Sequence, residues 1–320
     1  MTNAPVWRCS QKRWVTWMIR VVLLDLDDTL LLSPGNAFLG GFLSKLMAFL
    51  ENDLAAPHAG QILRAATERM TTSLDPLTAN LEIWEQVVND KIPSLVDGAY
   101  RAAIQRFYAI SYPELEAQTH PDPLAAALVE ALIERDYEVI IATNPLYPAV
   151  GIEQRVRWAG LDRFQFARVT HAENSHFAKP QPAYYQEILA ATGYEPGEAI
   201  MIGDSYGNDI IPAVAAGLRA YWVESDGLAA DGSIRPDGQG DLRRLKDMIV
   251  NEGWLENLPP RELEPAHMLS RLLADVAALA GMARSIPERF WNQRPDPQEW
   301  TPLEIVVHLK NTNAKPFAPA

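Results

Sequence analysis

Short, mainly apolar runs alternate with helix-like stretches over most of the chain. The runs are four to six residues long and lie at 19–24, 137–142, 164–169, 199–202 and 220–223. Such runs are typical of strands that are buried on both faces of a parallel sheet. Between the later runs, apolar residues recur at three- and four-residue spacing, at 124–135, 149–159, 182–191 and 209–216. This alternation predicts βαβ units, and hence an α/β fold with a doubly wound parallel sheet.

The stretch between the first two runs has a helical pattern throughout. Its apolar residues first recur at helical spacing at Phe38, Leu39, Phe42, Leu43, Leu46 and Phe49. The pattern continues at 62–70, 81–88 and 95–108, and no alternating strand pattern interrupts it. We therefore predict an all-helical insertion at 35–118 that divides a core made of residues 18–34 and 119–252.

The two ends of the chain differ from this pattern. Residues 1–17 are basic and aperiodic, and Lys12 and Arg13 interrupt the apolar stretch that a secretory signal needs. Because Met18 directly precedes the first apolar run, we expect translation to start there and residues 1–17 to be a disordered extension. Residues 253–320 hold two helical stretches and a proline-rich loop. Two helices bury little surface alone, so we expect this tail to pack on the core or to stay partly mobile.

Composition excludes several classes of protein. The 320 residues include 41 acidic and 28 basic side chains, for a net charge of −13, and 48% are hydrophobic. This balance is typical of a globular protein, and an acidic chain is poorly suited to general nucleic-acid binding. The single cysteine, Cys9, excludes an internal disulfide. No apolar run approaches the ~18 residues of a spanning helix, so we expect a cytoplasmic protein with neither a membrane nor a nucleic-acid partner.

Acidic residues follow two of the predicted strands. Asp25 and Asp27 come directly after the first run, and Asp204 and Asp209 lie in the segment after the run 199–202. Ligand sites in open α/β sheets lie beyond the carboxyl ends of the strands, so the carboxylates of Asp25 and Asp27, two residues apart, are expected to project into one such crevice. Because they repel one another, the crevice would favour a divalent cation.

Other polar residues lie in similar contexts. Thr143 and Asn144 follow the second predicted strand, and Lys179 precedes a predicted helix. Taken alone, a hydroxyl after a strand is commonly a helix cap, and a lysine is commonly a solvated surface charge. His171 and His176 lie close to Lys179 in the sequence, but we interpret them as loop residues rather than metal ligands.

Taken in order, the sequences DLDDTL, TN, KP and GDSYGND resemble the motifs of the haloacid dehalogenase-like hydrolase superfamily. Each lies after a predicted strand or before a predicted helix, as in that family, and the resemblance covers about residues 18–252. The position of the helical insertion is similar to that of the superfamily's C1-type helical cap. The resemblance therefore implies a Rossmann-like catalytic core with a cap that closes over it.

The resemblance also implies roles for individual residues. Asp25 resembles the nucleophile that becomes an aspartyl phosphate, and Asp27 resembles the general acid that later acts as a base. Thr143, with help from Asn144, would bind the transferring phosphoryl group. Lys179 would neutralise the charge of the nucleophile and the phosphate.

A Mg²⁺ site is implied by the same resemblance. Asp25, the backbone carbonyl of Asp27, and Asp204 would bind the ion, and Asp209 would be a second, water-mediated or orienting acid. An acid two residues after the nucleophile accompanies phosphatases and phosphomutases in the family, whereas dehalogenases lack it. Dehalogenation is therefore not expected of this chain.

The tail has a resemblance of its own. RPDPQEWTPLEIVVHLKN is similar to the start of the second helix of DinB-like four-helix proteins, and His308 matches the first of their three metal-binding histidines. The chain ends at Ala320, before the positions of the other two. We therefore expect a truncated or degenerate remnant without a metal site.

Together, these patterns predict a Mg²⁺-dependent phosphate-monoester hydrolase that acts on a small phosphorylated metabolite. A phosphomutase would use the same residues, and a non-catalytic binding protein could retain the same scaffold. The sequence leaves the phosphate ester and the oligomeric state open.

Overall fold

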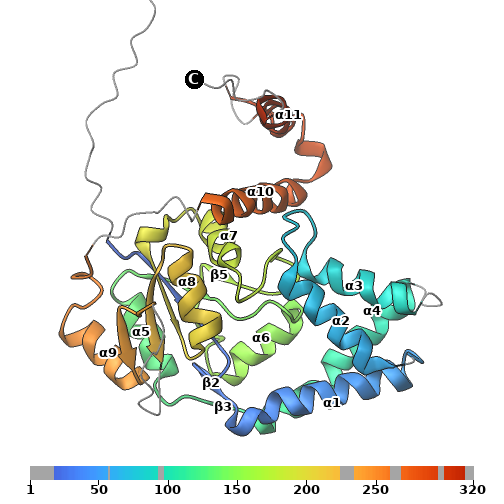
Figure 1. Ribbon diagram of the computed structural model, residues 1–320, viewed down its shortest axis with the longest axis horizontal. Helices are drawn as coiled ribbons and strands as arrows, with labels where there is room; N and C mark the ends of the chain where they lie inside the picture. The colour runs from blue at the N-terminus through green and yellow to red at the C-terminus, as the bar shows by residue number, and fades with distance from the viewer. Residues whose placement is uncertain are drawn as a thin grey trace, which may run out of the picture.

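The computed structural model describes residues 18–56, 58–92, 97–223, 234–259, 268–294 and 299–313. It has an α/β core, a lobe of helices beside the core, and two helices from the tail (Figure 1). The expectation for residues 1–17 lies outside the described residues. Within the described ranges, no helix is both long enough and apolar enough to cross a lipid bilayer.

The core is built on a six-stranded sheet in which every pair of neighbouring strands is parallel. The strands are β1 (Val21–Leu24), β4 (Glu138–Ile141), β5 (Arg168–Val169), β6 (Ala199–Gly203), β7 (Arg219–Val223) and β8 (Gly238–Gly240). Their spatial order is β5-β4-β1-β6-β7-β8, so the winding changes direction at β1. This confirms the predicted doubly wound sheet, and it places the point where such sheets bind ligands at the carboxyl end of β1.

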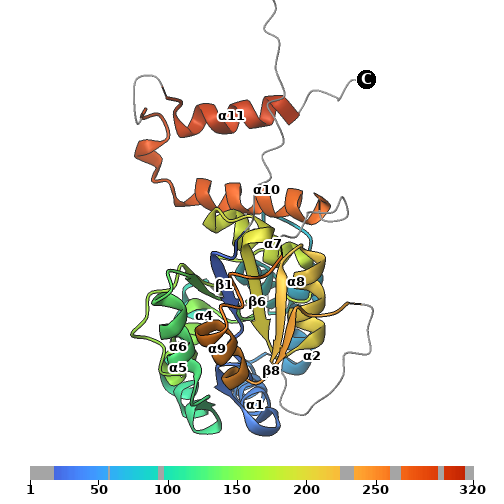
Figure 2. The ribbon, with the colours of Figure 1, turned by 90° about the vertical axis from the view of Figure 1, so that its left-hand side faces the viewer.

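Alternate side chains of β1 point to opposite faces of the sheet. Val22 and Leu24 join the hydrophobic cluster covered by α5 (Ala125–Ile133), α6 (Ala149–Trp158) and α9 (Leu242–Asn251). Val21 and Leu23 join the cluster covered by α7 (Pro182–Thr192) and α8 (Ile211–Ala215). Figure 2 shows helices on both faces of the sheet. Because both faces are covered, the strand has no exposed side, and its sequence is an uninterrupted apolar run.

Three elements differ from the predicted pattern. The run 164–169 forms a strand only at its last two residues, because residues 162–164 lie in a turn. The helix predicted at 209–216 begins earlier, with the π-helical turn η5 (Tyr206–Ile210) that precedes α8. The edge strand β8 has the sequence GQG, which carries no apolar signal. Short 3-10 helices complete the core and tail: η1 (Pro34–Asn36), η4 (Pro196–Glu198) and η7 (Glu288–Phe290).

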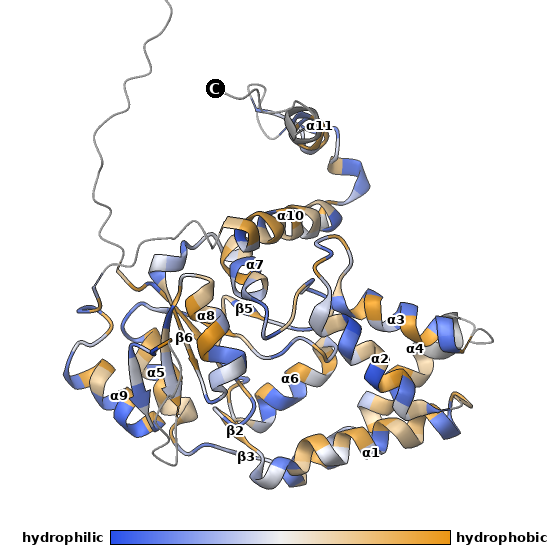
Figure 3. Ribbon diagram, in the orientation of Figure 1, coloured by the Kyte–Doolittle hydropathy of each residue, from blue (hydrophilic) through white to orange (hydrophobic). Residues whose placement is uncertain are grey.

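The helical lobe, called the cap below, lies between β1 and α5 in the sequence. It contains α1 (Ala37–Asn52), α2 (Ala59–Thr72), α3 (Asn80–Lys91), α4 (Asp97–Arg106), the π-helical turn η2 (Phe107–Ser111) and the 3-10 helix η3 (Pro113–Gln118). The chain enters and leaves the cap through the antiparallel pair β2 (Leu31–Leu32) and β3 (His120–Pro121). In Figure 3, α1 is coloured mainly as hydrophobic, and its Phe42 and Phe49 contact the ring of Phe107.

The tail helix α10 (Met268–Ser285) lies along α7, and α11 (Pro302–Asn313) lies farther out (Figures 1 and 2). Ala277 of α10 is fully buried in the cluster beside α7. Arg271 pairs with Glu195 of the core, with 2.8 Å between Nη2 and Oε1. Near the other end of α10, Arg284 donates a hydrogen bond to the backbone carbonyl of Leu77, in the cap. Helix α10 therefore packs on the core and also contacts the cap.

We predict that Ala277→Glu detaches α10 from α7, because a carboxylate at this fully buried position would lose its hydration. Burial of an unpaired charge costs several kcal/mol, so the undocked population should rise at least about tenfold. Hydrogen exchange of the α10 amides, followed by mass spectrometry, measures this population. Leu272→Glu is the control, since Leu272 is 61% exposed on the same helix and should leave exchange at the wild-type rate. Equal exchange in both variants would contradict the docking.

Candidate active site

Three carboxylates meet at the carboxyl edge of the two central strands. Asp25 directly follows β1, Asp204 directly follows β6, and Asp209 lies in η5, the next turn along the chain. One oxygen from each lies within 4.8 Å of the others. Asp25 and Asp209 are buried, with 6% and 1% of their surface exposed. The parallel pairing of β1 with β6 therefore brings together acids that are far apart in the sequence.

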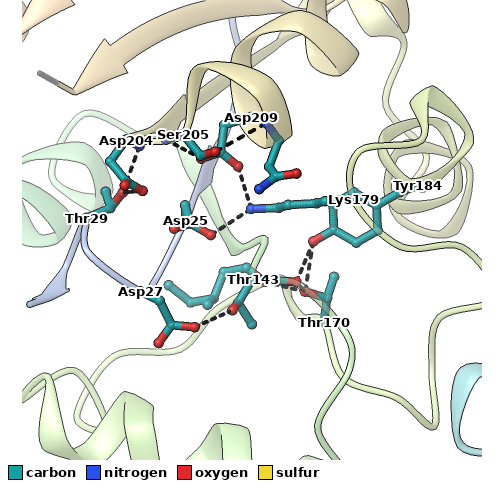
Figure 4. A network of polar contacts seen from close by, with 12 residues as sticks. Asp25, Asp27, Thr29, Thr143, Thr170, Lys179, Tyr184, Asp204, Ser205 and Asp209 are labelled. Atoms are coloured by element: carbon teal, nitrogen blue, oxygen red, sulfur yellow. Dashed lines mark hydrogen bonds and ion pairs between the residues drawn. The ribbon is translucent and has the colours of Figure 1, made fainter. Parts of the chain in front are cut away.

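Lys179 joins two of these acids. Its Nζ lies 2.6 Å from Asp25 Oδ1 and 2.6 Å from Asp209 Oδ1, and its side chain is almost fully buried (Figure 4). The residue lies just before α7, and the first turns of that helix place the rings of Tyr184 and Tyr185 beside it. The lysine is thus an internal counter-ion, and not the solvated surface charge that its sequence context alone would suggest.

The charges of the cluster do not balance. Burial raises the pKa of Asp25 well above its usual range, and the charges of Asp209 and Asp204 add to this effect, while Lys179 opposes it. The pKa of Asp204 is raised to about 6, first by burial and then by the charge of Asp209. Burial lowers the pKa of Lys179, but the two paired acids raise it by more, so the ammonium stays charged. One cation among three carboxylates leaves an excess of negative charge.

This donor set fits a hard divalent cation. The available ligands are carboxylate and carbonyl oxygens, which Mg²⁺ prefers, and the excess negative charge would be offset by a dication. Lys179 contacts Oδ1 of Asp25, and Thr29 donates a 3.2 Å hydrogen bond to Oδ1 of Asp204. Each of these two acids therefore keeps a second oxygen that could bind a metal.

Asp209 differs from the other two acids because protein donors contact both of its oxygens. Lys179 contacts Oδ1, and the backbone N–H of Ser205 donates a 3.0 Å hydrogen bond to Oδ2. The carboxylate also lies so close to Gly203 that a Cβ there would collide with it. This geometry suits an acid that orients Lys179 and the loop after β6, rather than one that binds a metal directly.

Thr143 and Asn144 follow β4, on the other side of β1. The Thr143 side chain is fully buried, and its backbone carbonyl accepts hydrogen bonds of 2.7 Å from the hydroxyls of Tyr184 and Thr170. The Oδ1 atom of Asn144 is buried and has no hydrogen-bond partner among the described residues. The backbone of the loop after β4 is therefore fixed in place by the hydroxyls of Tyr184 and Thr170.

Asp27 points away from the other acids, as Figure 4 shows. Its Oδ2 lies 3.5 Å from the hydroxyl of Thr143 and accepts a hydrogen bond from Nη1 of Arg155. Arg155 belongs to α6 and is fully buried, and its guanidinium lies 4.1 Å from the centre of the Tyr147 ring. Two of its other nitrogens, Nε and Nη2, have no hydrogen-bond partner among the described residues.

The sequence interpretation missed Arg155. A signal exists, because Ile152, Arg155, Val156 and Ala159 share the buried stripe of α6, where an arginine needs a partner. The partner, Asp27, is 128 residues away in the chain, so the pattern of α6 alone could not identify it.

The histidines lie outside the acid cluster. Nδ1 of His171 pairs with Glu173 at 2.8 Å, and Nδ1 of His176 pairs with Glu187 at 2.7 Å, as suits loop residues. In α11, His308 lies against Trp300. Within the described residues it joins no group of three possible metal ligands, and the DinB-like resemblance stays a prediction.

The comparisons with known proteins agree with this geometry. The family model for haloacid dehalogenase-like hydrolases matches residues 19–217. The chain is 29% identical to the phosphoserine phosphatase of Thermus thermophilus over 71% of its length and 98% of that protein. It is 30% identical to the phosphoglycolate phosphatase of Rhodospirillum rubrum over 68% of its length and 86% of that protein.

Structural similarity supports the same fold. The crystal structure of a 2-haloacid dehalogenase from Pseudomonas syringae superposes with a TM-score of 0.53 at 22% identity. The match covers 74% of this chain and 100% of that protein. Motif order, sheet topology and the family match lead to one conclusion: the chain belongs to the haloacid dehalogenase-like hydrolase family.

Proposed function

We propose that this protein is a Mg²⁺-dependent phosphate-monoester hydrolase that acts on a small phosphorylated metabolite through an aspartyl-phosphate intermediate. The observation that carries the proposal is the buried Asp25–Lys179–Asp209 bridge, with Asp204 beside it at the edge of β1 and β6. The relatives named as phosphatases support hydrolysis of a phosphate ester. Asp27 supports it further, because an acid at this position can protonate an alcohol leaving group.

The proposed reaction begins at Asp25. One oxygen of its carboxylate attacks phosphorus, and the bond from phosphorus to the ester oxygen breaks as the new bond forms. Asp27, in its protonated form, gives its proton to the departing oxygen. Water then attacks phosphorus and gives a proton to Asp27, which releases inorganic phosphate and regenerates Asp25.

The other residues hold the phosphoryl group and its charge. Thr143 and Asn144 would donate hydrogen bonds to phosphate oxygens, and Lys179 would fix Asp25 in position through the contact that it makes with Oδ1. Asp25, Asp204 and the carbonyl of Asp27 would hold the metal, with Asp209 orienting Lys179. When bound, Mg²⁺ supplies positive charge that offsets the repulsion between a carboxylate nucleophile and a phosphate dianion.

We predict that Asp25→Asn lowers Mg²⁺-dependent hydrolysis of p-nitrophenyl phosphate by at least about a thousandfold, because an amide cannot act as the nucleophile. Initial rates of p-nitrophenol release measure the effect, and circular dichroism checks the fold. Asp90→Asn is a matched control, since Asp90 undergoes the same chemical change on the exposed side of α3. A wild-type rate in Asp25→Asn would refute the assignment of the nucleophile. Isomerisation of a sugar phosphate without phosphate release would instead favour the phosphomutase.

We also predict that Asp204→Asn stabilises the metal-free protein at pH 7. The folded-state pKa of Asp204, about 6, lies above the ordinary value of 3.8, so its ionised form destabilises the fold above pH 6. Removing this charge should raise the free energy of unfolding by about 1–3 kcal/mol. For the same reason, the metal-free wild type should lose stability as the pH rises from about 4 to about 6, with little further loss above that range, and the variant should lose less.

Thermal unfolding with and without Mg²⁺ measures both effects. Mg²⁺ should raise the melting temperature of the wild type, because it binds the folded state, and it should do little for Asp204→Asn. Asp90→Asn, on the exposed side of α3, should retain the wild-type response. An equal Mg²⁺-induced shift in Asp204→Asn would remove Asp204 from the proposed metal site.

A further inference from the structure

A cavity of about 790 Å³ lies between the cap and the core. Helices α1, α2 and α3 and the segment from α4 to η2 form most of its wall, and the loops after β4 and β5 close the core side. This volume is in the range of sites that hold whole small molecules. The residues of the four motifs do not line it, so neither the motifs nor their assigned roles account for it.

The cavity lies next to the candidate active site. Its core wall includes Leu146, Tyr147 and Pro148, which follow Thr143 and Asn144 in the loop after β4. The ring of Tyr147 also lies on the guanidinium of Arg155, which holds Asp27. An occupant of the cavity would therefore contact the loop that holds the phosphoryl-binding residues, only two side chains away from Asp27.

The lining of the cavity is mostly apolar. Its wall includes the side chains of Phe42, Leu46, Leu63, Met70, Trp84 and Ile104. The charged residues in the lining are Arg64 and Glu68, which lie one turn apart on α2 and are both exposed. A leaving group that carries an ammonium or a carboxylate would therefore meet few buried partners, and its desolvation would be unfavourable.

We propose that this cavity binds the alcohol portion of the substrate, and that the substrate is a phosphate monoester with an extended apolar group, either alkyl or aryl. The inference rests on the proposed function, because it names the substrate class of that same site. The phosphate lies at Asp25 and the apolar group extends under the cap. Short polar esters such as phosphoserine and phosphoglycolate leave the cavity largely unfilled.

The test compares kcat/KM for a series of n-alkyl phosphates from methyl to octyl, with phosphoserine and phosphoglycolate included. Each added methylene that enters the cavity should raise kcat/KM about fourfold until the cavity is full. A flat series, or a preference for phosphoserine or phosphoglycolate, overturns the inference and leaves the phosphatase intact. If phosphoserine or phosphoglycolate is preferred, Arg64 and Glu68 would be the groups that recognise the charged ester.

Binding provides a readout that does not depend on turnover. Calorimetry with the non-hydrolysable octylphosphonate and methylphosphonate should give a Kd at least about tenfold lower for the octyl compound, because more apolar surface is buried. Equal Kd values would overturn the inference. If neither p-nitrophenyl phosphate nor any alkyl phosphate is hydrolysed while octylphosphonate still binds selectively, the proposed function fails and the apolar site stands.

A matched pair of variants tests whether the cavity causes the preference for long alkyl phosphates over short ones. Leu43 lines the cavity and is 38% exposed, and Ile133 of α5 lies outside it and is 39% exposed. Leu43→Glu places a carboxylate in the apolar wall, and it should lower the ratio of octyl to methyl kcat/KM at least about tenfold. Ile133→Glu should retain the wild-type ratio. Equal ratios in both variants would show that the apolar group binds elsewhere.

Discussion

Repulsion among buried carboxylates is the constraint on which this structure depends. Asp25, Asp204 and Asp209 lie within a few ångströms of one another at the carboxyl edge of the sheet, and among the described residues only Lys179 pairs with acids of this cluster. Burial raises the pKa values of Asp25 and Asp204, and the charges of the neighbouring carboxylates raise them further. A site with this imbalance costs stability in the metal-free protein, and the fold tolerates it because the apolar clusters on both faces of the sheet stabilise the strands.

The parallel sheet also explains which parts of the molecule could be predicted from sequence. A strand covered on both faces must be apolar throughout, so β1, β4 and β6 are recognisable as runs. Their carboxyl ends meet at one edge, and Asp25 and Asp204 lie together there, as the resemblance to the family implied. The cap helices are also recognisable from short stretches of sequence, because each helix buries one stripe of its own residues at helical spacing.

Features that depend on residues far apart in the sequence were harder to predict from the sequence. Arg155 is recognisable as an arginine in an apolar stripe, but its partner, Asp27, lies in another part of the sequence. The strand β8 has no side-chain signal, and it forms because its backbone pairs with β7. The cavity under the cap arises from several helices at once, and no single segment encodes it. Sequence reasoning therefore found the groups proposed for the chemistry and left the space beside them undescribed.

The cap is attached to the rest of the molecule at more than one place. Its two chain crossings pair as β2 and β3, and on the far side Arg284 of α10 contacts the carbonyl of Leu77. Helix α10 is itself anchored to the core through Ala277 and the pair between Arg271 and Glu195. A movement that separates the loop between α2 and α3 from the core would break the Arg284 contact or carry α10 with it. It would also break the hydrogen bonds from Nε2 of Gln181 to the carbonyls of Thr71 and Ser73. The tail lies outside the family match. Through its contact with the cap, it thus affects how far the cap can move from the core, and with it the width of the cavity in which we place the substrate.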